Sequence, residues 1–129
     1  MQNIIEHYRD PENYGLLAGD NVEVVSVHNP VCGDRLILSV LLDDGIVESV
    51  GFEGEGCSIS QATMSMLSEE LVGKVLKDLQ RDLTKEMIVE MVGIDLSPTR
   101  LKCALLSLDA VKKVRLPKNG VRWKYLAGR

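Results

Sequence analysis

The spacing of hydrophobic residues in the first half of the chain predicts a small β-sheet. Residues 22–27 are rich in valine, and β-branched side chains favour strands. From position 36 to position 42, a leucine or valine stands at every second residue, which predicts a second strand with one buried face. Ile37 and Leu41 lie between these positions, so we expect the other face of this strand to be covered as well.

A tight turn is predicted at Asp44-Gly45, because these residues tolerate the positive φ angles of a two-residue hairpin. The chain then returns as a third strand beside the second. Side chains alternate between the two faces of a strand, and we expect Ile46, Val50 and Phe52 to lie on one face.

The second half of the chain has the three-to-four-residue hydrophobic spacing of helices. We expect a short helix near the start of the chain and four later ones, at 2–9, 59–71, 74–81, 84–92 and from 98 to about 111. Ser58 and Gln61 have the spacing of a capping box, and Ser97-Pro98 places a cap residue before a proline at the first helical position. Strands followed by helices predict an α+β fold with the helices on one face of the sheet.

Composition limits the functions open to these 129 residues. Apolar residues make up 45% and charged residues 26%, as in a globular protein with one core. Aromatic residues are only 4% and the formal net charge is −4. These values argue against nucleic-acid binding, either by base stacking or by contacts with the phosphate backbone. The chain has neither an apolar run of about 18 residues nor a charged leader followed by an apolar segment. We expect a cytoplasmic protein that binds neither nucleic acid nor membrane.

The end of the chain differs in charge from the rest. Seven lysines and arginines lie between positions 112 and 129, and no acidic residue stands among them. We therefore divide the chain into a globular domain, 1–116, and a basic tail, 117–129. Such a tail is usually solvated, with its first lysines near a helix C-terminus. The alternative is a docking patch for an acidic partner protein.

The three cysteines are the main candidates for chemistry. Their odd number excludes a closed set of disulfides and favours a thiolate site in a reducing compartment. Cys32 stands in a turn two residues before Asp34, where a sulfur and a carboxylate can face one point. Cys57 directly precedes a helix start, where N–H groups and the helix dipole stabilise a thiolate. Cys103 lies about a turn and a half into the last helix, after Lys102.

The separations between the cysteines, 25 residues and then 46, match no compact zinc finger, whose ligands come in close pairs. The tertiary fold would have to bring the thiols together. Three thiolates and one carboxylate would then form a ligand set suited to zinc or to an iron–sulfur cluster. The alternative for each cysteine is a small buried hydrophobic residue. His28, at a strand end, is a further candidate ligand.

Three motifs, in this order, resemble the iron–sulfur cluster assembly scaffolds, the family of NifU N-terminal domains, IscU and SufU. They are Asn29-Pro30-Val31-Cys32-Gly33-Asp34, Gly54-Glu55-Gly56-Cys57-Ser58-Ile59-Ser60 and Arg100-Leu101-Lys102-Cys103-Ala104. The resemblance extends from His7 to Val114. It implies an α+β domain in which a three-stranded antiparallel sheet packs against a layer of helices, with the thiols gathered at one exposed end.

The resemblance also implies a role in handling sulfur. Cys32, Asp34, Cys57 and Cys103 would bind the metal, and Cys57 or Cys103 would accept persulfide sulfur from a cysteine desulfurase. The chain would assemble a labile cluster, [2Fe–2S] rather than [4Fe–4S], and pass it to apo-proteins as a monomer or weak dimer. This role is that of a scaffold rather than an enzyme. The carboxylate of Asp34 is a harder donor than a thiolate and should weaken retention of the cluster.

Differences within the family leave a second function open. Lys102 stands before the third cysteine, as in the SufU branch, where the IscU branch has a histidine. Residues 84–97, however, leave no room for the insertion of the SufU branch, and residues 96–100 keep only part of the chaperone-binding sequence of IscU. The alternative function is a zinc-bound sulfurtransferase that works with a cysteine desulfurase. A purely structural zinc module is a third interpretation.

Overall fold

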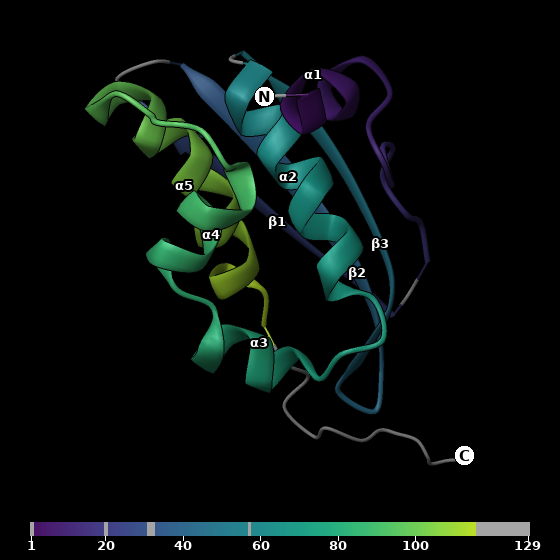
Figure 1. Cartoon of the computed structure of the whole chain (residues 1–129). Helices are drawn as coiled ribbons and strands as arrows, with labels where there is room; N and C mark the ends of the chain where they lie inside the picture. The colour runs from purple at the N-terminus through teal and green to yellow at the C-terminus, as the bar shows by residue number, and fades with distance from the viewer. Residues whose placement is uncertain (1, 20, 31–32, 57, 116–129) are drawn as a thin grey trace.

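A three-stranded antiparallel sheet forms one layer of the fold in the computed structural model (Figure 1). The structure describes residues 2–19, 21–30, 33–56 and 58–115, with side chains from residue 6 onward. The strands are β1 (Val22–Asn29), β2 (Asp34–Asp43) and β3 (Ile46–Glu55), and they lie in the order β1-β2-β3. The predicted sheet and the α+β class are confirmed. The basic tail at 117–129 lies outside the described residues.

The helices of the described residues form the second layer. They are α1 (Gln2–Arg9), α2 (Ser58–Leu71), α3 (Leu76–Asp82), α4 (Lys85–Val92) and α5 (Pro98–Lys113), all close to their predicted positions. Both α2 and α5 pack against the sheet and against each other, so they cover the same face of it (Figure 1). Among the described residues, no helix has the length and apolar character needed to cross a membrane.

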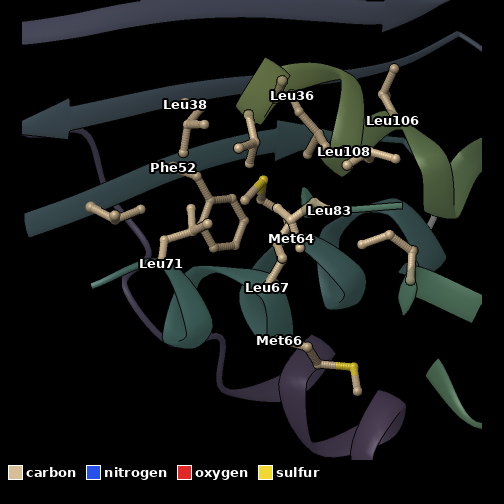
Figure 2. Close-up of a cluster of buried hydrophobic side chains, with 14 of the residues drawn as sticks. Leu36, Leu38, Phe52, Met64, Met66, Leu67, Leu71, Leu83, Leu106 and Leu108 are labelled. Carbon is tan, nitrogen blue, oxygen red and sulfur yellow. The ribbon is translucent and has the colours of Figure 1, made fainter. Parts of the chain in front are cut away.

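The hydrophobic core lies between the sheet and these helices. Leu36, Leu38 and Phe52 point from the strands toward α2, and each is fully buried. Figure 2 shows Met64 and Leu67 of α2 among them. Burying a side chain of this size stabilises the fold by roughly 1.5–3 kcal/mol. The core therefore supplies a packed support for the strand ends next to the candidate ligands.

Helix α2 is covered on the side away from the sheet as well, because α1 packs there. Met66 lies on this side, near α1, in Figure 2. The Ser65 hydroxyl of α2 joins this helix to the N-terminal segment. It accepts a hydrogen bond from the backbone N–H of Glu12 at 2.7 Å and lies 2.7 Å from Nδ1 of His7 in α1. Burial on both sides explains why α2 lacks a broad polar face.

The first half of β3 departs from the predicted alternation. Its register with β2 shifts there by one residue, a β-bulge that moves the following side chains to the opposite face. As a result, Val47 is buried at 1% exposure and Ile46 is exposed at 42%. The prediction that Ile46 shares one face with Val50 and Phe52 is therefore wrong, because Val50 and Phe52 are buried and Ile46 is not. The Asp44-Gly45 turn is confirmed, since both residues have positive φ angles.

The segment before β1 covers the outer edge of β3. The backbone carbonyl of Phe52 accepts a hydrogen bond from the N–H of Gly15 at 2.7 Å. The backbone N–H of Phe52 donates to the carbonyl of Asn13 at 3.1 Å. Further along, the N–H of Leu17 donates to the hydroxyl of Ser39, which is fully buried on the second face of β2. This segment accounts for the predicted covering of that face.

Candidate metal centre

The ends of all three strands meet at one end of the sheet. Asn29, the last residue of β1, pairs with Asp34, the first residue of β2, and the next residue of β2 pairs with Glu55 at the end of β3. The N–H of Gly33 donates to the Asn29 carbonyl at 2.7 Å and closes the turn between β1 and β2. Two of the predicted motifs are thereby brought together, although Cys32 and Cys57 themselves lie outside the described residues.

Asp34 is a buried carboxylic acid on the helix-covered face of the sheet. It is 1% exposed and shares this face with Leu36 and Leu38. Asn29, its partner across the strands, is also buried, at 7% exposure. A carboxylate is costly to bury unless hydrogen bonds or cations compensate for lost hydration. Its position is therefore typical of a functional group held in a fixed orientation.

Gly56 lies directly against Asp34. Its φ angle is +101°, and a β-carbon added there would stand 2.5 Å from Oδ1 of Asp34 and 3.0 Å from its α-carbon. Only glycine fits such a position without displacing its neighbour. This role was not predicted from the sequence, where its signal is a glycine directly before Cys57. Gly56, which directly precedes Cys57, thus contacts Asp34, which follows Cys32 by two positions.

The start of α2 differs from the predicted capping box. Ser58 is itself the first residue of α2, whereas a capping box requires it to precede the helix. The Gln61 side-chain amide donates to the Gly56 carbonyl at 3.3 Å. The predicted reciprocal cap between Ser58 and Gln61 is therefore wrong, but Gln61 still ties the helix start to the end of β3.

Cys103 lies in the second turn of α5 and is 2% exposed. The helix begins as predicted, because Ser97 accepts a hydrogen bond from the N–H of Arg100 at 3.3 Å and Pro98 follows the cap. Helix α5 packs against β1 and β2, so this cysteine faces the interior of the fold. A reagent or partner protein would need a local opening to reach its sulfur.

Neither histidine is placed beside Asp34. His28 is exposed and pairs with Arg35, and the strand alternation puts it on the opposite face of the sheet from Asp34. His7 contacts Ser65 and lies 3.4 Å from a carboxylate oxygen of Glu69, which assigns it to the contact between α1 and α2. Within the described residues, no three His, Cys, Asp or Glu side chains gather as a metal site.

The donor types at this end of the fold nevertheless suit a soft metal or a cluster. Asp34 would supply an oxygen donor beside Gly56, which has no side chain to cover it. Thiolates with one carboxylate are a donor set for zinc or iron. The described members of the predicted set, Asp34 and Cys103, are 1% and 2% exposed. This burial differs from the exposed end that the family resemblance implies for the thiols.

Comparison with known proteins agrees with the fold and the motifs. The model of the NifU-like N-terminal domain family matches residues 1–115. The chain belongs to this family. The predicted family resemblance is therefore confirmed.

Similar members of the family carry two different functional names. The chain is 38% identical to the zinc-dependent sulfurtransferase SufU of Bacillus subtilis, over 87% of this chain and 86% of that protein. It is 31% identical to the iron–sulfur cluster assembly scaffold protein IscU of Streptococcus pyogenes, over 88% and 80% of the two chains. The solved N-terminal part of a NifU-like protein from Brucella abortus has the same fold, with a TM-score of 0.67 at 24% identity over 87% of this chain and 88% of that one.

Proposed function

We propose that this NifU-like domain is an iron–sulfur cluster assembly scaffold of the reducing cytoplasm. It accepts sulfur from a cysteine desulfurase, builds a labile cluster on Cys32, Asp34, Cys57 and Cys103, and donates the cluster to apo-proteins. The observation that carries the proposal is the contact between Gly56 and Asp34, which joins the two motifs that contain Cys32 and Cys57. Helix α5, which carries Cys103, packs against β1 and β2 and supports including this cysteine in the set.

Sulfur transfer would occur by thiol–persulfide exchange. A thiolate of this chain attacks the outer sulfur of the desulfurase persulfide; a new sulfur–sulfur bond forms, and the desulfurase thiolate leaves. Cys57 is the better first acceptor, because it precedes α2 and the N–H groups of a helix start favour a thiolate. Cys103 is 2% exposed and is poorly placed to meet a second protein directly.

Assembly and release place different demands on the ligands. The transferred sulfur must gain two electrons from a reductant outside the chain before it can serve as sulfide. Thiolates hold the iron firmly, whereas the carboxylate of Asp34 is a harder ligand and retains a soft cluster less tightly. A scaffold needs this weakness, because its cluster must leave.

A second candidate function is a zinc-bound sulfurtransferase. The relative named as a zinc-dependent sulfurtransferase is 38% identical to this chain, and Lys102 precedes the third cysteine as the resemblance to the SufU branch implies. In this case Cys57 or Cys103 carries persulfide onward without building a cluster. Zinc on the same residues would supply a positive charge that keeps their thiols deprotonated.

Anaerobic reconstitution distinguishes these functions. The chain is incubated with ferrous iron, cysteine, a reductant and a cysteine desulfurase, and absorbance in the visible range is followed. A scaffold turns brown, and serine at any one of the three cysteine positions abolishes the colour while circular dichroism stays unchanged. Lack of colour, with one tightly bound zinc and faster desulfurase turnover, would instead establish the sulfurtransferase. Colour that persists in all three serine variants would contradict both functions.

A further inference from the structure

A hydrophobic groove opens between α2, α3 and α4. The groove has a volume of about 510 Å³ and is lined by residues from the second half of α2. The candidate metal centre adjoins the first residue of that helix, so the two sites lie toward opposite ends of α2. The apolar lining of the groove comes mainly from α3 and α4 and includes Val75, Leu79, Leu83, Met87, Ile88 and Met91.

Part of this lining is open to solvent. Val75 is 40% exposed and Met87 is 47% exposed, although both are apolar. Neighbouring exposed apolar side chains that line a groove are typical of a binding surface. The groove is therefore shaped to take apolar side chains from another segment.

The border of the groove is mainly acidic. Glu70, Asp78 and Asp82 line it, together with one lysine, Lys74. Arg81 contacts both Asp78, at 3.1 Å, and Asp82, at 2.9 Å, and Lys74 contacts Glu70 at 3.6 Å. These ion pairs are exposed, and pairs of this kind contribute little, so the border still favours a basic occupant.

The chain itself leaves the described structure beside this groove. The Gln80 side-chain amide of α3 donates to the Val114 carbonyl at 2.6 Å and to the Val111 carbonyl at 3.1 Å. The end of α5 is thereby held against α3, whose Asp78 and Leu79 line the groove. The fourteen residues from 116 to 129 span up to roughly 45 Å when extended, several times the width of about 10 Å of one helix.

The composition of this segment complements the groove. Between positions 121 and 125, Val121, Trp123 and Tyr125 alternate with Arg122 and Lys124. In an extended conformation, alternate residues face opposite sides, so one side is apolar and the other is basic. The segment from 116 to 129 contains no acidic residue.

We propose that the groove between α2, α3 and α4 is a docking site for residues 116–129 of the same chain. Trp123 and Tyr125 contact the apolar lining, and the basic side chains lie near Asp78 and Asp82. Attachment at Val114 gives the segment an effective concentration in the millimolar range, so it outcompetes a separate partner of similar sequence. This inference does not depend on the proposed cluster chemistry.

The fluorescence of Trp123 tests the proposal directly, because it is the only tryptophan of the chain. The emission maximum and acrylamide quenching are measured for the full chain and for a synthetic peptide of residues 116–129. We expect a blue-shifted maximum and several-fold weaker quenching in the full chain. Met87→Lys should return both values toward those of the peptide. Val89→Lys is the matched control, since Val89 is 37% exposed on the same helix and does not line the groove.

Asp78→Lys provides a second test, because this side chain is exposed and the change reverses one border charge. It should increase quenching in the full chain without altering its circular dichroism. Wild-type quenching equal to that of the peptide would overturn the proposal, as would equal effects of Met87→Lys and Val89→Lys. Shielding that grows with protein concentration would identify a second copy as the occupant and would also overturn it. Shielding that appears only when a separate acidic protein is added would show that the segment binds that partner instead.

Discussion

Gly56 and Asp34 are in contact across the end of the sheet, so that a β-carbon on Gly56 would stand 2.5 Å from a carboxylate oxygen of Asp34. The contact joins the segment before α2 to the first residue of β2. The backbone of Gly56 thereby packs against the side chain of Asp34. The geometry around Asp34 should therefore be sensitive to one methyl group.

Gly56→Ala tests this contact. We expect the free energy of unfolding to fall by about 1 kcal/mol for the left-handed backbone and by a further 1–3 kcal/mol for the overlap with Asp34. Gly33→Ala is the matched control, because Gly33 also has a positive φ angle, but a β-carbon there would have no neighbour within 4 Å. Urea denaturation measures the free energy of unfolding of both variants. Equal losses in the two variants would contradict a packing role for Gly56.

Asp34→Ala should lengthen the lifetime of a reconstituted cluster, because it removes the hard oxygen ligand that favours release. The decay of visible absorbance in the presence of a chelator measures the lifetime. Asp43→Ala changes an exposed aspartate at the opposite end of β2 and should leave the decay unchanged. An unchanged or shorter lifetime in Asp34→Ala would exclude this function for Asp34.

Cys103 should react slowly while the protein is folded. A variant with Cys32→Ser and Cys57→Ser leaves it as the only thiol, and its reaction with a disulfide reagent can be followed by absorbance. Because Cys103 is 2% exposed, we expect a rate at least about a hundredfold below that in denaturant, which corresponds to a local opening of about 3 kcal/mol. Equal rates would show that Cys103 is accessible and would remove its burial as a reason for preferring Cys57 as first acceptor.

Ser65→Ala should loosen the attachment of the N-terminal segment to α2. The change removes the acceptor for the Glu12 N–H and the partner of His7, at a cost of about 1–3 kcal/mol in unfolding free energy. Ser107→Ala is a suitable comparison: Ser107 is equally buried, but it bonds only to the Ala104 carbonyl of its own helix. Thermal denaturation should show a clearly larger loss for Ser65→Ala than for Ser107→Ala.

The sequence was sufficient for features governed by local chemistry. The Asp44-Gly45 turn and the cap at Ser97 depend on residues that are near one another in the chain. The alternation in β2 also follows from its own residues. These elements could therefore be predicted without knowledge of their neighbours.

Features that depend on contacts between distant segments could not be predicted in this way. The bulge that exposes Ile46 results from the pairing of β3 with β2, and no residue type in the hairpin predicts it. The contact of Gly56 with Asp34 joins residues 22 positions apart, and the burial of Ser65 requires α1 to pack on α2. The candidate ligands were recognisable by their motifs, whereas the burial of Asp34 and Cys103 became apparent only in the fold.

X-ray absorption spectroscopy of the zinc-loaded full chain tests the central claim most directly. Three cysteines and Asp34 around one metal predict three sulfur neighbours at about 2.3 Å and one oxygen at about 2.0–2.2 Å. Serine at position 32, 57 or 103 should each replace one sulfur scatterer with a lighter atom. A wild-type spectrum with fewer than three sulfur neighbours, or one unchanged by these substitutions, would contradict a shared metal centre.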